Sequence, residues 1–420
     1  MQRDTTVAIV GLGYVGLPLA VAFAEAGCTV VGLDIGEELV EAVNAGESHI
    51  EDVPPARLAA TGERLRATTD VAELAAVDAI VICVPTPLSI QREPDLGPLL
   101  SAARAVAGIV REGQLVVLES TTYPGTTREQ LVPILEQASG LTAGEDFYVA
   151  FSPERVDPGR TDYTLRNTPK VIGGLSPEST RRAHELYGIV CDHLVDVSTP
   201  EAAELEKLLE NIFRSVNIAL VNELAMLCDR MGIDVWEVID AAATKPYGFM
   251  KFEPGPGMGG HCLPVDPFYL SWKAREVGFA TEFIELAGKV NQHMPEYCVE
   301  RVVRALNEAG KPVKNTGIAL IGVAYKASVG DMRESPALKI GRLLQSLGAD
   351  LRYHDPFVEE VPELGLRGLS LDEALAGADL AVIITAHPEV DHDAVASRAP
   401  LVLDLRGVTR GSAAASVMQL

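Results

Sequence analysis

The stretch Thr6-Val7-Ala8-Ile9-Val10-Gly11-Leu12-Gly13-Tyr14-Val15-Gly16 decides the fold of the first part of this chain. An apolar strand, 6–10, runs directly into a G-x-G-x-x-G turn, and the segment 17–26 then reads as a helix. A second strand, 29–33, ends at Asp34. Strand, glycine turn, helix and acid in this order predict a Rossmann unit that binds a dinucleotide.

Each glycine of the turn has a mechanical role in that prediction. Gly11 allows the tight turn, Gly13 lets the backbone approach the pyrophosphate, and Gly16 lets the helix pack closely on the strand. The pyrophosphate then caps the helix N-terminus. Asp34 would accept hydrogen bonds from the adenosine ribose, which favours NAD over NADP. The alternative is a glycine turn in an unrelated α/β protein, and the flanking strand, helix and acid argue against it.

Strands and helices continue to alternate beyond this unit. Apolar strands at 79–84, 115–118 and 148–151 are separated by helical segments. This alternation predicts a parallel sheet with its ligands at the carboxyl ends of the strands. The polar residues that stand just beyond those ends are Thr86, Ser120, Thr121 and Ser152-Pro153-Glu154.

A long helix at 200–232, with Thr199 as its cap, interrupts the alternation. Helices of this length commonly bridge two domains, and an apolar stripe along it would suit a dimer core. The residues of that stripe are Leu205, Leu208, Leu209, Ile212 and Val216. Further helices follow, and a second α/β unit begins near residue 316 without the glycine fingerprint, so a second dinucleotide is not expected.

We therefore predict an α/β protein with two Rossmann-like, doubly wound domains joined by a long central helix and a helical dimerisation region. The predicted parts are an NAD-binding domain at 1–198, a central helical domain at 199–312 and a ligand-binding domain at 313–420. A homodimer or larger homo-oligomer is expected from the long apolar helix.

The charge of the chain argues against a nucleic-acid-binding protein. It has 35 Lys and Arg against 59 Asp and Glu, a net charge of −24, whereas a protein that neutralises phosphates needs a basic face. No segment is apolar over the length of a bilayer, and 1–6 lead into a strand without a basic leader, so we expect a cytoplasmic protein with no membrane part. The six cysteines include no C-x-x-C pair, which argues against a metal site and a disulfide framework.

A set of motifs along nearly the whole chain resembles the nucleotide-sugar 6-dehydrogenases, a family typified by UDP-glucose dehydrogenase. The resemblance implies the four-electron oxidation of C6 of a UDP-sugar to the uronate, with NAD as the oxidant. In chain order the motifs are Gly11-Leu-Gly-Tyr-Val-Gly16, Val84-Pro-Thr-Pro87, Glu119-Ser-Thr121, Ser152-Pro-Glu154, Lys207 with Asn211, Gly257-Met-Gly-Gly-His-Cys262 with Asp266, and Asp331-Met-Arg-Glu-Ser335.

Three of these regions resemble the UDP-N-acetylglucosamine 6-dehydrogenase branch of the family: 119–127, 244–249 and 260–262. Glucose-type members have a second glutamate four residues after the one that matches Glu154, and this chain has Pro158 there. The resemblance implies UDP-N-acetylglucosamine as the substrate. UDP-glucose, UDP-N-acetylmannosamine, UDP-N-acetylgalactosamine and dTDP-glucose are the alternatives.

The same resemblance implies covalent catalysis by Cys262. Its thiolate adds to the aldehyde that the first oxidation forms, and the second oxidation gives a thioester that water hydrolyses. Lys207 is the implied base of the first step, and Asn211 would donate to the tetrahedral intermediates. On spacing alone Lys207 would instead be a solvated helix residue paired with Glu204, and a lone cysteine is usually a core residue.

The remaining polar residues of the motifs are assigned to water, cofactor and substrate. Thr121, Asp266 and Glu154 would hold the hydrolytic water, with Glu154 the general base in preference to Asp157. We expect the cofactor residues to be Gly11, Gly13, Tyr14, Val15, Gly16, Asp34, Thr86, Ser120, Thr121 and Arg333. We expect the substrate residues to be Glu154, Arg155, Lys207, Asn211, Tyr247, Phe249, Gly257, Gly259, Lys326 and Arg406, with no metal.

Two other classes of protein stay open as alternatives. A two-electron hydroxyacid dehydrogenase would form one NADH per substrate and would survive Cys262→Ala. A non-catalytic NAD-binding protein would bind nucleotide without turnover.

Overall fold

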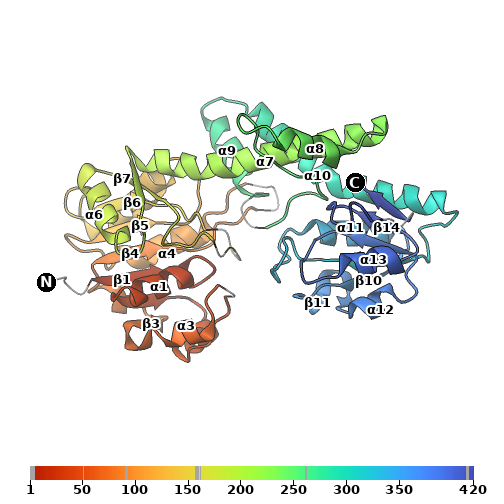
Figure 1. The fold of residues 1–420 in the computed structure, drawn as a ribbon. Coiled ribbons are helices and arrows are strands. Elements are labelled where there is room, and N and C mark those ends of the chain that lie inside the picture. Colours follow the sequence, from red (N-terminus) through yellow and green to blue (C-terminus); the bar gives the residue numbers. More distant parts are fainter. Residues whose placement is uncertain are drawn as a thin grey trace. The chain divides into compact units, whose positions relative to one another are not determined.

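The computed structural model describes residues 5–50, 52–89, 93–156, 160, 162–260, 263–412 and 416–420 of the chain. The chain forms two compact units, which we call the first and the second unit. The first comprises residues 1–210 and 268–278, and the second comprises residues 211–267 and 279–420. The boundary at residue 210 falls inside the long helix α7 (Pro200–Met231), drawn in yellow-green to green in Figure 1. The division into three domains at 1–198, 199–312 and 313–420 stays a prediction.

The first unit is built on an eight-stranded sheet with the order β3-β2-β1-β4-β5-β6-β7-β8. All neighbouring strands run parallel except β6 and β7, so the predicted parallel sheet is confirmed apart from this pair. The described residues between β6 and β7 include no helix, and a parallel crossover usually needs one. The strands are β1 (Thr6–Val10), β2 (Thr29–Leu33), β3 (Leu65–Thr68), β4 (Ala79–Ile82), β5 (Leu115–Leu118), β6 (Tyr148–Phe151), β7 (Lys170–Gly174) and β8 (Leu194–Val197).

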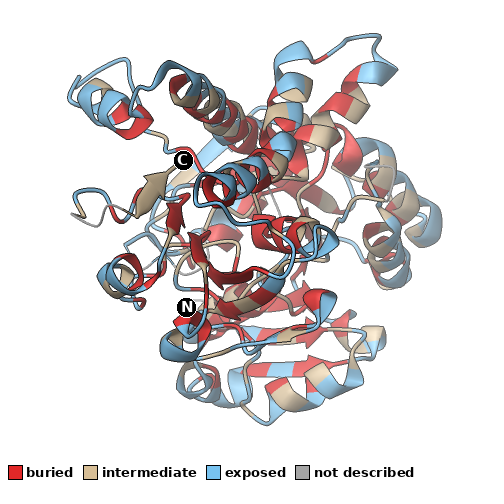
Figure 2. Cartoon of the chain, turned by 90° about the vertical axis from the view of Figure 1, so that its right-hand side faces the viewer, coloured by how far each residue is buried: buried red, intermediate tan, exposed pale blue. Residues whose placement is uncertain are grey.

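Helices cover both faces of this sheet, because successive residues of a strand point to opposite faces. Ile9 of β1 belongs to a core shared with Leu17 and Tyr187, while the next residue, Val10, belongs to a core shared with Leu99. Figure 2 shows this burial in red along the strands and the inner helix faces. The helices of the unit are α1 (Gly16–Glu25), α2 (Glu37–Asn44), α3 (Pro55–Ala59), α4 (Gly97–Ala107), α5 (Val132–Ser139), α6 (Pro177–Tyr187) and most of α9 (Asp266–Glu276).

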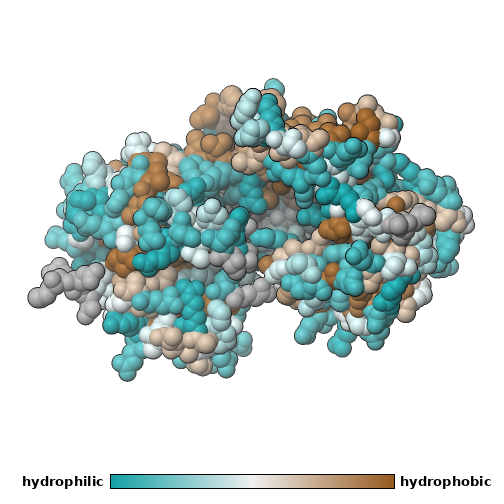
Figure 3. All heavy atoms as spheres, in the orientation of Figure 1, coloured by the Kyte–Doolittle hydropathy of each residue, from teal (hydrophilic) through white to brown (hydrophobic). Residues whose placement is uncertain are grey.

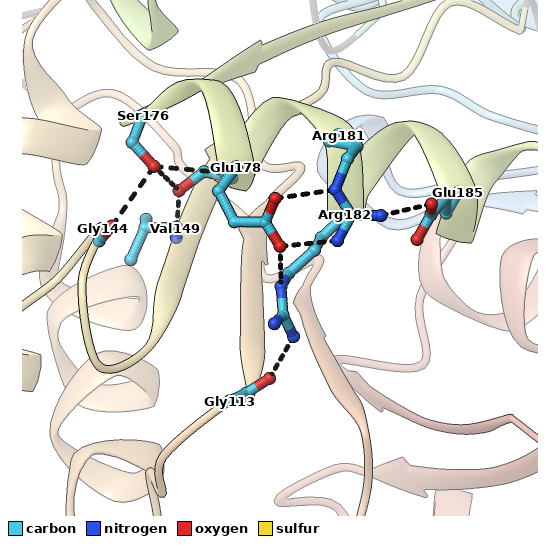
Figure 4. A network of polar contacts seen from close by, with 9 residues as sticks. Gly113, Gly144, Val149, Ser176, Glu178, Arg181, Arg182 and Glu185 are labelled. Carbon is cyan, nitrogen blue, oxygen red and sulfur yellow. Dashed lines mark hydrogen bonds and ion pairs between the residues drawn. The ribbon is translucent and has the colours of Figure 1, made fainter.

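Helix α6 is fixed to the sheet by the polar network in Figure 4. Ser176 caps the helix by accepting a hydrogen bond from the backbone N–H three residues on, at 3.2 Å. Glu178 accepts from the Arg182 guanidinium at 2.9 Å, and Arg182 donates in turn to the Gly113 carbonyl at 2.8 Å. The same guanidinium lies 3.9 Å from the ring centroid of Tyr148. Tyr187, the last residue of α6, is fully buried in the core.

The second unit contains a five-stranded parallel sheet with the order β10-β9-β13-β14-β15. Leu320 of β9 shares a core with Val302 and Leu344, and the next residue, Ile321, shares the opposite core with Val395. The strands are β9 (Gly317–Ile321), β10 (Asp350–His354), β13 (Leu380–Ile383), β14 (Val402–Asp404) and β15 (Val417–Gln419), with a separate hairpin of β11 (Glu360–Val361) and β12 (Leu366–Arg367). The helices are α8 (Val235–Ala243), α10 (Glu282–Glu308), α11 (Pro336–Ser346), α12 (Leu371–Leu375) and α13 (His392–Arg398).

Helix α7 confirms the long helix predicted at 200–232, but not its single apolar stripe. Leu208 and Ile212 are buried, whereas Leu205 and Leu209 are exposed. The predicted stripe was therefore wrong: its residues divide between a covered and an uncovered side. Among the described residues, no helix is long and apolar enough to cross a membrane.

Candidate active site and cofactor site

The turn between β1 and α1 has the geometry that a dinucleotide needs. Gly11 has φ of 93°, and a Cβ placed on it would stand 2.8 Å from the Cys83 carbonyl oxygen. A Cβ on Gly16 would stand 1.8 Å from the Gly11 carbonyl oxygen. At Gly13, by contrast, no heavy atom lies within 4 Å of the Cβ position, so the backbone is open to a ligand there. Packing therefore requires two of the glycines, and the third leaves room for the pyrophosphate.

Asp34, just after β2, is fixed by this turn. Its two carboxylate oxygens accept backbone hydrogen bonds from Leu12 at 2.9 Å and from Gly36 at 3.0 Å. The side chain is half-buried, and each oxygen keeps a lone pair for a ribose hydroxyl. Tyr14 is exposed and Val15 half-buried at the start of α1. The acid, the open glycine and the helix N-terminus together fit NAD.

The loops after β4 and β5 are joined by side-chain to backbone hydrogen bonds. The Thr86 hydroxyl donates to the Thr121 carbonyl at 2.7 Å, and the Ser120 hydroxyl donates to the Val84 carbonyl at 2.7 Å. Tyr269 of α9 donates to the Thr86 carbonyl at 2.8 Å. The structure therefore brings three predicted cofactor residues to one end of the sheet.

Glu204 holds the turn that follows Thr121, and sequence reasoning missed this role. Its buried carboxylate accepts hydrogen bonds from the Gly125 N–H at 2.6 Å, the Thr127 N–H at 2.8 Å and the Thr127 hydroxyl at 2.7 Å. Burial raises the pKa of Glu204 to about 7, although these hydrogen bonds act in the opposite direction. The pairing of Glu204 with Lys207, considered as the alternative for that lysine, is therefore wrong.

Lys207 and Glu154 meet in the first unit. The Lys207 ammonium donates a hydrogen bond to the backbone carbonyl of Glu154, and the Glu154 side chain accepts from the N–H groups of Arg155 at 2.8 Å and Val156 at 2.5 Å. Burial alone would raise the pKa of this carboxyl, but the ammonium of Lys170, the Val156 N–H and Lys207 outweigh it and lower the pKa. Glu154 is therefore ionised at neutral pH, as a general base must be.

Behind Glu154 lies a buried cluster that the sequence did not reveal. Lys170 of β7 is 2% exposed, and its ammonium contacts a carboxylate oxygen of Glu119 and lies 3.6 Å from Glu154 Oε2. The other Glu119 oxygen accepts from the Tyr187 hydroxyl at 2.5 Å. Burial raises the pKa of Glu119 to about 7, and the neighbouring charge of Glu154 acts in the same direction.

Arg155, a predicted substrate residue, is already engaged within the first unit. Its guanidinium pairs with Glu210, lies 3.6 Å from Glu206 and donates to the Pro169 carbonyl at 2.7 Å. Burial and then the charge and hydrogen bond of Glu210 raise the pKa of Glu206 to about 7. A substrate contact of this guanidinium stays a prediction.

In the second unit, Asn211 and Asp266 form a buried pair. The Asn211 amide donates to Asp266 Oδ2 at 2.5 Å, and the two residues are 4% and 2% exposed. Asn211 follows Lys207 by four residues on α7, and Asp266 is the first residue of α9. Two of the predicted catalytic residues thus lie in contact.

The glycine-rich loop at 255–260 packs against protein on several sides. A Cβ on Gly259 would stand 2.7 Å from the Tyr325 Cβ, and one on Gly260, where φ is 85°, would stand 2.8 Å from the Tyr325 ring. A Cβ on Gly257, where φ is 128°, would stand 3.2 Å from the Asn291 carbonyl oxygen. These glycines admit close packing of the chain, and their contact with substrate stays a prediction. Cys262, with 261 beside it and with 157–159, lies outside the described residues.

Arg406 is a cation beside this loop, with part of its side chain exposed. Burial of the guanidinium lowers its pKa, although the charges of Glu253 and Asp404 act in the opposite direction. A Cβ on Gly255 would stand 2.5 Å from its guanidinium, and within the described ranges that guanidinium forms no hydrogen bond or ion pair. It is therefore available for a phosphate. Lys326 is half-buried after β9, while Arg333 is exposed and pairs with Asp331.

The predicted aromatic residues of the sugar pocket stand in the open. Tyr247 is 73% exposed and Phe249 is 41% exposed in the loop after α8, and the Lys245 ammonium lies 5.1 Å from the Tyr247 ring centroid. Their role toward a sugar stays a prediction. Over the described part of the chain, no group of three or more His, Cys, Asp and Glu side chains is arranged to hold a metal ion.

Comparison with known proteins places this chain in a family. Three models of the UDP-glucose/GDP-mannose dehydrogenase family match the chain: the NAD binding domain at residues 5–190, the central domain at 201–293 and the UDP binding domain at 319–411. A UDP-N-acetyl-D-mannosamine dehydrogenase of Pyrococcus horikoshii is 40% identical over 91% of this chain and 90% of its own length. A UDP-N-acetyl-D-glucosamine 6-dehydrogenase of Pseudomonas aeruginosa is 38% identical over 85% and 84%.

The fold agrees with a solved structure of the same kind. The UDP-D-ManNAc dehydrogenase structure from Pyrococcus horikoshii superposes with a TM-score of 0.91 at 36% sequence identity, covering 99% of each chain. The predicted fold of two Rossmann-like sheets with long helices between them in the sequence is therefore confirmed.

Proposed function

We propose, from the premise that the chain belongs to the UDP-glucose/GDP-mannose dehydrogenase family, that it oxidises C6 of a UDP-N-acetylhexosamine to the carboxylate. Membership makes it an NAD-dependent nucleotide-sugar dehydrogenase. The observation that carries the proposal is the meeting of Lys207 with Glu154, whose carboxylate is ionised and partly exposed.

Two sugars compete within the proposal. UDP-N-acetylglucosamine is the first candidate, because the segments 244–249 and 260–262 resemble that branch. UDP-N-acetylmannosamine, its epimer at C2, is the second, because the relative at 40% identity and the structure with a TM-score of 0.91 carry that name. One pocket contact shifts such a preference by only about 1–3 kcal/mol, so the test must compare both sugars directly.

The first half-reaction falls to Lys207. NAD, when bound, would accept one hydride in the first oxidation, and a second NAD, bound after the first NADH has left, would accept the hydride of the second oxidation. Lys207 is anchored at the Glu154 carbonyl, from where we assign its neutral amine to the C6 hydroxyl. The amine would take the hydroxyl proton while the carbon–hydrogen bond breaks and its electron pair leaves C6 as the hydride that bound NAD accepts. The product of this half-reaction is the aldehyde.

The second half-reaction falls to Cys262. Its sulfur adds to the aldehyde carbon, and oxidation of the thiohemiacetal leaves a thioester. Water then attacks the thioester carbonyl, Glu154 takes the water proton, and the carbon–sulfur bond breaks to return the thiol and the carboxylate. Asn211, already oriented by Asp266, would donate to the tetrahedral oxyanion.

The decisive experiment is a panel of UDP- and dTDP-sugars, scored for NADH formed per substrate and for carboxylate product. We expect two NADH per UDP-N-acetylhexosamine, and no carboxylate from the Cys262→Ala variant. A single NADH per substrate, or full turnover by Cys262→Ala, would establish a two-electron dehydrogenase instead. Nucleotide binding without turnover of any sugar would establish a non-catalytic protein.

We also propose that the chain forms a homo-oligomer through α7. Its exposed apolar residues in the second unit follow spacings of seven, four, three and four, as in the seam of a coiled coil: Phe213, Leu220, Leu224, Leu227 and Met231. Apolar surface gathers along the upper edge of Figure 3, where α7 and α8 run. Light scattering should give at least twice the chain mass, and Leu224→Glu with Leu227→Glu should lower it while Leu347→Glu does not.

A further inference from the structure

Lys170 is an unusual residue for the interior of a sheet. It lies in β7, between β6 and β8, and it is 2% exposed. A lysine is almost never fully buried unless opposite charge or hydrogen bonds compensate for the loss of water. The compensating groups here are the carboxylate of Glu119, which follows β5, and the carboxylate of Glu154, which lies beyond the end of β6. Tyr187 of α6 donates to Glu119.

These groups are arranged in one direction, from the core toward Glu154. Innermost, Tyr187 donates to Glu119, and its ring centroid lies 5.0 Å from the Lys170 ammonium. Next, the ammonium contacts the second oxygen of Glu119. Last, it lies 3.6 Å from Glu154 Oε2, whose side chain is 18% exposed. The cluster therefore begins in the core and ends at the proposed base.

Both carboxylate oxygens of Glu154 have partners in this arrangement. Its Oε1 accepts the two backbone hydrogen bonds from Arg155 and Val156, and its Oε2 faces Lys170. Stability alone does not account for the cluster, because apolar residues of similar volume often replace a buried ion pair without loss. What apolar residues cannot do is orient a carboxylate and keep it ionised.

We propose that Lys170 is a positioning residue for Glu154, holding this carboxylate in one orientation and in its charged form, while Glu119 and Tyr187 hold Lys170. The inference rests on the proposed function, in which Glu154 is the base that activates water for thioester hydrolysis.

The proposal has a consequence for pH. The groups that act on Glu154 are Lys170 of β7, Lys207 of α7 and Glu119 after β5. Tyr187 of α6 acts on Glu119, Cys191 acts on Lys170, and Cys83 acts on Tyr187. Of the two cations, Lys170 has the larger effect in lowering the pKa of Glu154 against the effect of burial. Without Lys170 the base should lose its charge at a higher pH, and an opposite charge at this range moves a carboxyl pKa by about one pH unit or more.

The test compares four variants. Lys170→Met removes the cation, and Lys170→Arg restores it in a different shape. The double variant Glu119→Gln with Lys170→Met leaves no buried unpaired carboxylate at 119 and keeps a hydrogen-bonding partner for Tyr187, so the test still decides if Lys170→Met alone fails to fold. Lys273→Met is the matched control, since it removes an ion-paired lysine of the same unit from Glu129 and Glu276.

Two readouts are needed. The first is the pH profile of turnover with a UDP-N-acetylhexosamine. The second is the pH titration of the carboxylate infrared band that Glu154→Gln abolishes, which needs no substrate. We expect the acidic limb and the infrared titration to move upward by about one pH unit in Lys170→Met and the double variant. They should recover in Lys170→Arg and stay unchanged in Lys273→Met.

Unchanged infrared titration in Lys170→Met and in the double variant would overturn the positioning role. So would a fall in turnover with an unchanged pH profile, because that is the signature of a merely structural residue. Failure of the wild-type chain to oxidise any UDP-N-acetylhexosamine would instead refute the proposed function, and the infrared titration would still decide the role of Lys170.

Discussion

Replacing Glu204 with glutamine should stabilise the first unit at alkaline pH relative to the native chain, and should give no gain in stability at acidic pH. The buried carboxylate of Glu204 accepts three hydrogen bonds from Gly125 and Thr127, and it holds the turn that begins with Thr121. Burial nevertheless raises its pKa from 4.5 to about 7. The charged form is therefore the less favourable form in the folded chain.

The sign and size of the effect follow from proton linkage. The folded state holds the proton of Glu204 more tightly than the unfolded chain, so its contribution to the free energy of unfolding falls as pH rises from about 4.5 and levels off above about 7. At about 1.4 kcal/mol per pH unit, the difference between the two pKa values lowers the free energy of unfolding by roughly 3 kcal/mol in total. Roughly 2.5 kcal/mol of this loss occurs between about pH 5 and about pH 8.5. Glutamine cannot ionise and escapes this loss. Its single oxygen leaves one backbone donor unmatched, which costs about 1 kcal/mol at every pH.

The assay uses the fluorescence of Trp272, whose ring centroid lies 5.0 Å from that of Tyr123 in the first unit. The chain has two tryptophans, and Trp236 of the second unit has no hydrogen-bond partner for its indole N–H among the described residues. Trp236→Phe therefore gives a background in which Trp272 alone reports unfolding. Urea unfolding of this background, with and without Glu204→Gln, is measured at several pH values.

The comparison isolates Glu204, because Glu119 has a pKa raised to about 7 by burial in both proteins. The difference in the free energy of unfolding should move by about 2.5 kcal/mol in favour of glutamine from about pH 5 to about pH 8.5. A difference that stays constant with pH would refute the reasoning, since it would mean that the three donors stabilise the charged form as well as water does.

Three further predictions concern the sites themselves. Gly13→Ala should leave the thermal midpoint unchanged and should weaken NAD binding about tenfold or more in calorimetry. Gly16→Ala should instead lower the free energy of unfolding by about 1–3 kcal/mol, because its methyl group would stand 1.8 Å from the Gly11 carbonyl oxygen. Lys207→Met should lower turnover by about 10²–10⁴ with NAD affinity retained, followed by NADH absorbance, and near-normal turnover would contradict its role as base. Arg406→Met should raise the KM for the UDP-sugar about tenfold or more with kcat and urea midpoint kept, and an unchanged KM would show that the phosphates bind elsewhere.

Local patterns predicted the elements that bury apolar residues regularly. The strands at Thr6–Val10 and Thr29–Leu33 agree with β1 and β2, and the helix expected at 200–232 agrees with α7 to within a residue. These predictions succeeded because strand and helix periodicity is a property of neighbouring residues. The apolar stripe of α7 failed, because which side of a helix is covered depends on the elements that pack against it.

Charged residues in the core were the larger omission. Lys170 and Glu119 are 51 residues apart in the chain, and Glu204 is 77 residues from Thr127, so no local spacing links them. Each of these residues would be taken for a solvated one from the sequence. Only the fold shows that distant parts of the chain supply opposite charges and backbone donors to these buried side chains.

The glycines at 255–260 show a different kind of limit. A glycine permits close approach of anything to the backbone, and the sequence could not say whether that was a ligand or the protein. The structure answers for Gly259 and Gly260, which face Tyr325. Gly13 is the opposite case, because its Cβ position is open and leaves room for a ligand.

The two sheets also use the acid after their second strand in opposite ways, which bears on why one unit takes a dinucleotide. Asp34 is half-buried, and each of its carboxylate oxygens accepts one backbone hydrogen bond, from Leu12 and from Gly36. Its counterpart after β10, Asp355, is buried, and a single oxygen accepts from the N–H groups at 323 and 324 at 2.7 and 3.0 Å and from His387 at 3.0 Å.

His387 closes that second position. Its Nδ1 accepts from the Ser328 N–H at 3.1 Å, so the ring proton sits on Nε2 and points at Asp355. Both side chains are fully buried, and a ribose hydroxyl could reach the carboxylate only by displacing the imidazole. The same βαβ topology thus presents an accessible acid in the first unit and a buried, fully hydrogen-bonded one in the second. Because that carboxylate is closed to a ribose hydroxyl, a nucleotide in the second unit would have to be held through other groups, and Arg406 beside the loop at 255–260 is the one that we predict for its phosphates.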